Sequence, residues 1–215
     1  MGKEETTMKI SYAITVCNEL NEIKQLLPLL KEHKRATDEI IILFDDKNGD
    51  NEVLEYLLPF NKLPNIQTWR GLVFVNDFAI WKNKLNDYCT GDYIFQLDAD
   101  ELISKELIQG LPEIIENNSE VDLFVFPRIN NVSGITDEHI RQWGWQIDEK
   151  GRINFPDWQG RLYKKGLRWG GKVHEKIVGA KTYSLMPIED EYCLLHNKTI
   201  ERQEKQNNFY NKIKK

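Results

Sequence analysis

An acidic hexapeptide near the middle of the chain constrains the fold more than any other segment. Leu97-Asp98-Ala99-Asp100-Glu101-Leu102 follows an apolar run over residues 93–97 that is typical of a buried strand. Burying either aspartate without a partner would cost roughly several kcal/mol. A hard divalent cation is a suitable partner, because Mg²⁺ and Mn²⁺ take oxygen ligands and commonly bridge carboxylates to substrate phosphates. The hexapeptide therefore predicts a metal site at the carboxyl end of a strand.

Strand and helix patterns alternate along the first 130 residues. Apolar and β-branched runs predict strands at 10–16, 39–44, 66–69, 93–97 and 123–126. Helical spacing of apolar residues lies between these runs, and Asn18 and Asp77 are expected to cap the helices that follow them. This alternation predicts a doubly wound α/β fold with a mainly parallel, Rossmann-like sheet.

Polar clusters follow three of the predicted strands. Asn18 with Glu19, Asp45 with Asp46, and the aspartates of the hexapeptide occupy these positions. In doubly wound sheets, ligands bind beyond the carboxyl ends of the strands. We therefore expect the three clusters to line one cleft.

The chain changes character after about residue 130. Short strand-like pieces at 161–164, 172–178 and 192–196 lie among glycines and the tryptophans Trp143, Trp145, Trp158 and Trp169. This composition predicts a loop-rich extension or lid on the same domain. The tryptophans are expected to form local core, and stacking on a sugar face is the alternative for one or two of them.

Length and charge limit the possible organisation. The chain has 215 residues, of which 40% are apolar, so it can bury one substantial core and is expected to form a single domain, 1–215. Its net charge of −5 gives no argument for a nucleic-acid partner. The last twenty residues hold six Lys or Arg against two Glu. They predict a solvated basic helix at 199–215, with contact to an anionic membrane surface as the alternative.

The cysteines and the apolar runs bear on location. Cys17, Cys89 and Cys193 lie far apart and lack C-x-x-C spacing, and the first seven residues are polar. The longest uninterrupted apolar run, 40–44, is too short to cross a bilayer, so no transmembrane segment is expected. We expect a soluble, cytoplasmic protein with reduced thiols, and peripheral contact with the inner membrane surface is the alternative.

Four segments in this order and spacing resemble the family-2 glycosyltransferases, which are inverting nucleotide-sugar enzymes of the GT-A fold. The segments are Ile14-Thr15-Val16-Cys17-Asn18-Glu19, Ile41-Ile42-Leu43-Phe44-Asp45-Asp46, the stretch 83–94 and the acidic hexapeptide. The stretches 157–163 and 169–175 look like a small bacterial subgroup that includes glucosyltransferases of lipopolysaccharide-core and cell-envelope assembly. The resemblance implies a nucleotide-sugar half at 9–130 and an acceptor or lid half at 131–198.

The resemblance also implies roles for individual residues. The nucleotide-binding set would be Thr15, Val16, Asn18, Glu19, Asp45 and Asp98. Asp98 and Asp100 would hold Mn²⁺ or Mg²⁺, with His196 completing the shell or serving as a structural residue. The implied donor is a nucleoside-diphosphate sugar, UDP-sugars being favoured, and the acceptor is a glycan or lipid-linked glycan.

Two departures from the family pattern affect these expectations. Cys17 stands where the family often has an aromatic residue and no proline opens that motif, so base stacking is expected to be weaker. The glutamine-arginine-tryptophan signature of processive polymerases is missing as a unit, which favours transfer of a single sugar.

Sugar transfer needs a base to accept the proton of the attacking hydroxyl. Glu175 is the first candidate and Asp157 the second, and for Glu175 a salt bridge or a contact with His174 is the structural alternative. Lys172 or Arg161 would meet the diphosphate.

Three other functions were weighed. A nucleotidyltransferase of related fold would need a glycine-rich phosphate loop after the first strand, where Cys17-Asn18-Glu19 stands. A phosphatase with a D-x-D motif usually has Thr or Val two places on, where this chain has Leu102. A non-catalytic sugar-nucleotide or glycan-binding module is the remaining alternative, although the chain keeps both aspartates.

Overall fold

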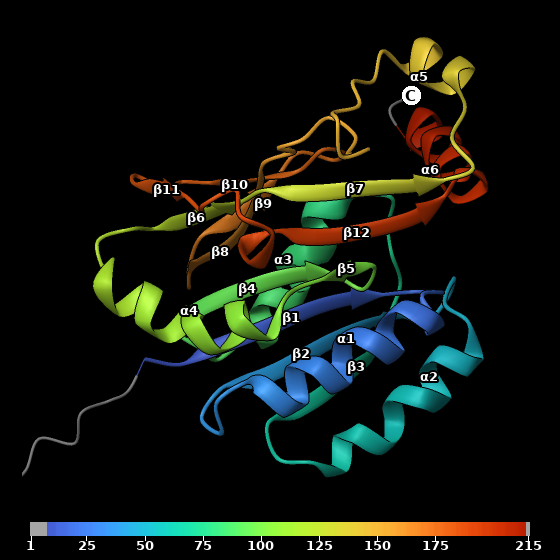
Figure 1. Ribbon diagram of the computed structural model, residues 1–215. Coiled ribbons are helices and arrows are strands. Elements are labelled where there is room, and N and C mark those ends of the chain that lie inside the picture. Colours follow the sequence, from blue (N-terminus) through green and yellow to red (C-terminus); the bar gives the residue numbers. More distant parts are fainter. Residues whose placement is uncertain (1–7, 214–215) are drawn as a thin grey trace, which may run out of the picture.

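A seven-stranded sheet forms the centre of the computed structural model, which describes residues 8–213 (Figure 1). The strand order is β11-β6-β8-β4-β1-β2-β3. Strands β4, β1, β2 and β3 are parallel, whereas β8 is antiparallel to both of its neighbours. The bounds are β1 (Ile10–Val16), β2 (Glu39–Asp45), β3 (Ile66–Leu72), β4 (Tyr93–Asp98), β6 (Leu123–Phe126), β8 (Gln159–Lys164) and β11 (Tyr183–Leu185). The predicted α/β fold with a mainly parallel sheet is confirmed.

Helices cover both faces of this sheet. The apolar sides of α1 (Leu20–His33), α2 (Asn51–Leu57) and α4 (Lys105–Asn117) share one buried cluster, while α3 (Phe78–Tyr88) packs on the other face with the ribbon of β9 (Arg168–Gly170) and β10 (Lys176–Val178). Short 3-10 turns lie at Leu58–Lys62 and Asp190–Tyr192. This two-layered covering explains why the central strands are apolar on both faces.

Two of the helix starts test the predicted caps. Asp77 caps α3, because its carboxylate accepts a hydrogen bond from the backbone N–H of Ile80. The predicted cap at Asn18 is wrong, since the N-cap position of α1 is Glu19. The longer side chain of Glu19 reaches back and accepts from the backbone N–H groups of Cys17 and Asn18, which leaves Asn18 outside the helix.

A second, three-stranded sheet lies beside the acidic hexapeptide. It has the order β5-β12-β7, with β5 (Glu101–Leu102), β12 (Leu194–Thr199) and β7 (Arg128–Ser133). The register sets His196 opposite Glu101 on one side and opposite Asn130 on the other. Pairing of β5 with β12 thus brings His196 to the acidic hexapeptide.

The second half of the chain is more than a lid. Strands β8 and β11 belong to the central sheet, whereas α5 (Asp137–Trp143) and the loops around it extend away from it (Figure 1). Trp169 is core, with 5% of its surface exposed, and Trp143 packs on Trp145. Trp158 differs from them because it is 37% exposed, so stacking on a sugar stays a prediction for this residue.

The basic end of the chain forms α6 (Ile200–Ile213), as expected, and within it Ile213 is buried while the other residues are exposed or half-buried. Arg202 makes ion pairs with Glu19 and Glu22, and Tyr210 packs edge-on against Phe78. One side of α6 is therefore held against the body of the protein. Residues 214–215 of the predicted helix lie outside the described residues.

Two expectations about location can be compared with the structure. Over residues 8–213, no helix combines the length and the apolar character needed to span a bilayer. The three cysteines carry free thiols. The polar residues 1–7 lie outside the described residues.

The carboxylate of Glu39 joins β1 and β2 near their amino ends. Its pKa predicts that the stability of the fold depends on pH. Burial alone would raise its pKa, but hydrogen bonds from Lys9, Ser11 and Thr90 outweigh this and lower the pKa from 4.5 to about 2. A carboxyl group with a lowered pKa stabilises the fold above its unfolded-state pKa, and that stability is lost as the pH falls. We expect Glu39→Gln to lower the free energy of unfolding at pH 7 by about 2–3 kcal/mol, and by progressively less between pH 4.5 and 2.

Urea unfolding at several pH values measures this difference. Glu106→Gln is the matched control, because the Glu106 side chain is 56% exposed and its lysine partner is 3.8 Å away. Equal unfolding free energies for wild type and Glu39→Gln at pH 7 would contradict the assignment.

Candidate functional site

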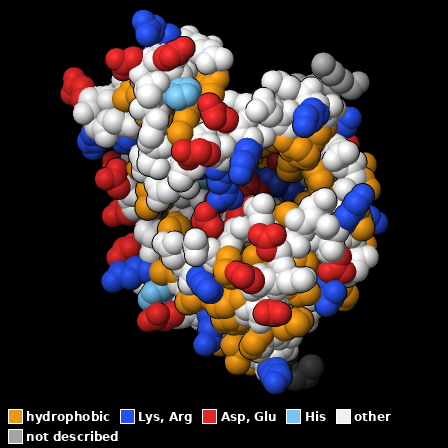
Figure 2. Space-filling model, turned by 90° about the vertical axis from the view of Figure 1, so that its right-hand side faces the viewer, with side chains coloured by type: hydrophobic (Ala, Val, Ile, Leu, Met, Phe, Trp, Pro, Cys, Tyr) orange, Lys and Arg blue, Asp and Glu red, His pale blue; other side chains and the backbone are white. Residues whose placement is uncertain are grey.

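A hollow lies at the carboxyl ends of the central strands. Figure 2 shows acidic and basic side chains on its floor and hydrophobic side chains along part of its rim. Two of the three predicted polar clusters meet here: the hydroxyl of Thr15 at the end of β1 lies 3.3 Å from Asp98, and Arg202 contacts both Glu19 and Asp100. The third cluster is bonded locally instead, because Asp45 accepts hydrogen bonds from Lys47 and Asn48 within its own turn.

Asp98 lies between two buried cations. Lys82 Nζ is 3.1 Å from one carboxylate oxygen, and Arg161 Nη2 donates to the other at 2.9 Å. Burial would raise the pKa of Asp98, but these two cations hold it well below its usual range. Asp98 is thus an ionised group in the hollow, with 31% of its side chain exposed.

Glu101 organises the two arginines behind this site. Its side chain has no exposed surface, and Oε1 accepts from Arg161 at 2.5 Å and from Arg128 at 3.0 Å. Its other oxygen accepts from the backbone N–H of Asp98 at 3.2 Å. Removing one member of such a buried network leaves an uncompensated charge, which costs about 3–5 kcal/mol. These contacts therefore fix the position of Asp98.

A chain of hydrogen bonds orients His196 toward Asp100. Asn130 donates its amide N–H to Asp157 at 2.8 Å, so its carbonyl oxygen faces His196 Nδ1, also at 2.8 Å. Nδ1 must then be the donor, which directs Nε2 to the Asp100 carboxylate 3.2 Å away. A hydrogen bond to the far ring nitrogen is the usual way in which proteins orient a metal-binding histidine.

The Asp100–His196 pair fits a divalent ion. Neighbouring ligands of an octahedral ion with bonds of about 2.1 Å lie about 3 Å apart, close to the 3.2 Å observed. Over residues 8–213, no cluster of three or more His, Cys, Asp or Glu side chains could hold an ion with protein ligands alone. Waters and substrate phosphates would have to supply the other positions. Asp98 pairs with Lys82 and Arg161, so its role as a metal ligand stays a prediction.

The two candidate bases differ in their surroundings. Glu175 pairs with Lys82 at 2.8 Å, and its side chain is 14% exposed. Asp157 accepts from Arg128, Asn130 and Gln159. Burial would raise the pKa of Asp157, but Arg128 and these hydrogen bonds lower it. A carboxylate that is already saturated with donors is a poorer proton acceptor, so the geometry favours Glu175.

The remaining predicted residues are dispersed. Val16 is buried in the core, Asn18 is exposed, and Lys172 donates to the backbone carbonyl of Ile213. Arg161 is buried and contacts Asp98, and Glu175 forms a salt bridge with Lys82, which is one of its two structural alternatives.

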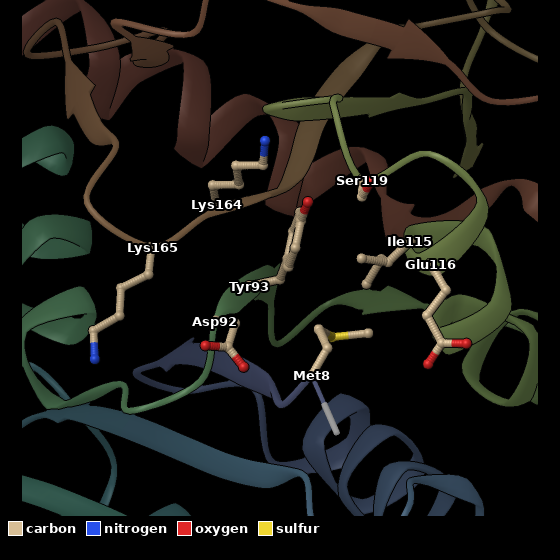
Figure 3. Close-up of a pocket in the computed structure, with 8 residues that line it drawn as sticks. All are labelled: Met8, Asp92, Tyr93, Ile115, Glu116, Ser119, Lys164 and Lys165. Carbon is tan, nitrogen blue, oxygen red and sulfur yellow. The ribbon is translucent and has the colours of Figure 1, made fainter. Parts of the chain in front are cut away.

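A separate pocket lies at the other end of the sheet. It has a volume of about 600 Å³ and opens beside the amino ends of β1 and β4 (Figure 3). Its lining residues are Met8, Asp92, Tyr93, Ile115, Glu116, Ser119, Lys164 and Lys165. None of the predicted site residues lines it.

Sequence reasoning gave no role to several residues of the site: Lys82, Glu101, Arg128, Asn130 and Arg202. Weak signals for three of them exist. Lys82 interrupts the apolar side of a predicted helix, Glu101 belongs to the acidic hexapeptide, and Arg128 lies two residues after a predicted strand. Asn130 and Arg202 carry no such signal, because strand pairing and helix docking bring them to the site.

Comparison with known proteins shows the family to which the chain belongs. The model of the family "Glycosyl transferase family 2" matches residues 11–175. The SPbeta prophage-derived glycosyltransferase SunS of Bacillus subtilis (strain 168) is 29% identical over 186 residues, and SunS of Bacillus phage SPbeta is equally similar. The match covers 84% of this chain but 40% of those relatives, so the chain spans about two fifths of their length.

Solved structures share the fold. TarS 1-349 of S. aureus superposes with a TM-score of 0.63 at 13% identity, covering 88% of this chain and 60% of TarS 1-349. Its complex with UDP gives a TM-score of 0.64 at 14% identity, covering 88% and 60%. The central sheet is therefore that of the GT-A fold, and the narrower resemblance to lipopolysaccharide-core enzymes stays a prediction. With the family model matching most of its length, the chain belongs to glycosyl transferase family 2.

Proposed function

We propose that this chain transfers one sugar, with inversion, from a nucleoside-diphosphate sugar to an acceptor hydroxyl. The main support is the arrangement of Glu175, Lys82 and Asp98 beside the Asp100–His196 pair in one hollow. A base, fixed cations and a pair of metal-binding side chains are the groups that such a displacement needs. A non-catalytic binding module would not need the base.

Glu175 would accept the proton of the acceptor hydroxyl as the hydroxyl oxygen attacks the anomeric carbon. The bond from that carbon to the diphosphate oxygen breaks in the same step, and the diphosphate leaves with the bonding electrons. Lys82, 2.8 Å from Glu175, would orient the carboxylate for this step.

Asp100 and His196 would hold a Mn²⁺ or Mg²⁺ ion between the protein and the diphosphate. When bound, such an ion supplies Lewis-acid stabilisation of the negative charge that grows on the leaving group. The buried Arg161 and Lys82 keep Asp98 ionised and in place, so that it can accept hydrogen bonds from the ribose.

We favour a UDP-sugar as the donor, because TarS 1-349 shares the fold and has been solved with UDP-GlcNAc and with UDP. A glycan or lipid-linked glycan is the proposed acceptor, and the exposed Trp158 beside Asp157 supports a sugar-bearing molecule. A lipid-linked acceptor would bring the reaction to a membrane surface, where Lys212 of α6 would meet anionic headgroups.

Thermal unfolding against UDP, GDP, CDP and dTDP, with and without Mn²⁺, tests the donor. We expect one nucleotide to raise the Tm by about 5–10 °C at saturation, and only with Mn²⁺ present. Release of free sugar from the corresponding nucleotide sugars then separates an enzyme from a binding module. If no nucleotide shifts the Tm, the proposal is wrong; if one does but no sugar is released or transferred, the binding-module alternative is correct.

A further inference from the structure

Helix α6 brings one arginine to the mouth of the site. The helix rises directly from the tip of β12, at the carboxyl ends of the strands (Figure 1). Arg202 in its first turn lies 3.4 Å from Asp100 Oδ2, the oxygen that also faces His196 Nε2 at 3.2 Å. Its guanidinium therefore competes for the oxygen that a divalent ion would take.

Three carboxylates surround this guanidinium. Arg202 faces Glu22 at 2.5 Å, Glu19 at 3.0 Å and Asp100 at 3.4 Å. Asp100 has a further positive neighbour in Lys198, so it does not depend on Arg202 alone for a positive partner. Asp100 is the most distant of the three partners, so a divalent ion can displace Arg202 from it without removing the two shorter pairs.

A second set of contacts keeps α6 in place if that displacement occurs. Tyr210 packs edge-on against Phe78 and His174, and Phe209 lies near Phe74 and Phe78. Lys172 also bonds the backbone at the end of the helix. The helix can thus remain docked while the guanidinium changes partners.

We propose that Arg202 is a donor-binding residue, which holds the cation position beside Asp100 in the donor-free protein and moves to the diphosphate when a divalent ion binds. This inference rests on the proposed function. The planar guanidinium suits both states, because it binds carboxylate and phosphate oxygens in the same forked geometry. In this way α6 contributes to donor binding.

Binding of Mn²⁺ alone and of UDP with Mn²⁺ separates this role from a structural one. We expect Arg202→Ala to bind Mn²⁺ alone about threefold to tenfold more tightly, because a competing positive charge is gone. The same variant should bind UDP in saturating Mn²⁺ about tenfold to a hundredfold more weakly, because a charged hydrogen bond to phosphate is lost. Electron paramagnetic resonance of free Mn²⁺ and titration calorimetry give the two affinities.

Lys205→Ala is the matched control, since it removes an equal charge from an exposed position of the same helix and should change neither affinity. Arg202→Lys keeps the charge and the fold but not the forked geometry, so it should leave Mn²⁺ affinity nearly unchanged and still weaken UDP. Both affinities falling together in Arg202→Ala, or neither changing, would overturn the inference while leaving the proposed function intact. Absence of Mn²⁺-dependent UDP binding by the wild type would overturn both.

Discussion

Glu175→Gln is expected to lower sugar transfer by about 10²–10⁴-fold while donor binding survives. Glutamine keeps the shape of the side chain and can still accept a hydrogen bond from Lys82, which lies 2.8 Å from the carboxylate. It cannot take the proton of the acceptor hydroxyl. The effect should therefore appear in kcat for transfer and leave the Kd of the nucleotide nearly unchanged, which single-turnover kinetics and calorimetry measure separately.

Asp157→Asn is the comparison for this experiment. Asp157 accepts hydrogen bonds from Arg128, Asn130 and Gln159, so its substitution should lower stability and slow transfer only mildly. The opposite ranking, with Asp157→Asn inactive and Glu175→Gln active, would move the base to Asp157. Full activity in both folded variants would mean that neither carboxylate takes the proton.

The central sheet was predictable because its physical cause is local. The β-branched run Ile40-Ile41-Ile42 must be covered on both faces, and parallel strands in an α/β layer provide that covering. Asp77 caps its helix as expected, because an aspartate just before an apolar helical pattern can accept a hydrogen bond from a free backbone N–H of the first turn. The predicted cap at Asn18 failed because the N-cap position is Glu19, whose side chain accepts from the backbone N–H groups of Cys17 and Asn18 ahead of the helix.

The site was predictable only in part. The acidic hexapeptide indicates Asp98 and Asp100 as site residues, but their partners depend on contacts between distant segments. His196 reaches Asp100 because β12 pairs with β5, a two-residue strand that no periodicity could reveal. Arg202 looked like one of several solvated charges, and the docking of α6 through Phe209 and Tyr210 is what sets it beside Asp100.

Asp100→Ala is expected to remove Mn²⁺-dependent binding of the nucleoside diphosphate, with a loss of affinity above about 100-fold. Substituting a residue that merely orients a metal ligand commonly costs 10–100-fold, so removing the ligand itself should cost more. The fold should persist, because Asp100 lies in the turn between β4 and β5 and its neighbours Arg202 and His196 keep other partners, Glu19 and Asn130. Calorimetry with UDP and Mn²⁺, alongside the Tm of the ligand-free variant, measures both expectations.

A control and a comparison variant decide which aspartate holds the ion. Asp87→Ala removes a carboxylate in the last turn of α3 that is 47% exposed and paired with Arg168, and it should leave UDP affinity unchanged. Asp98→Asn should weaken UDP but preserve its dependence on Mn²⁺, because Lys82 and Arg161 rather than His196 surround that side chain. If Asp98→Asn abolishes the Mn²⁺ dependence and Asp100→Ala keeps it, the ion is held by the first aspartate of the hexapeptide, and the proposed pairing of Asp100 with His196 around the metal is wrong.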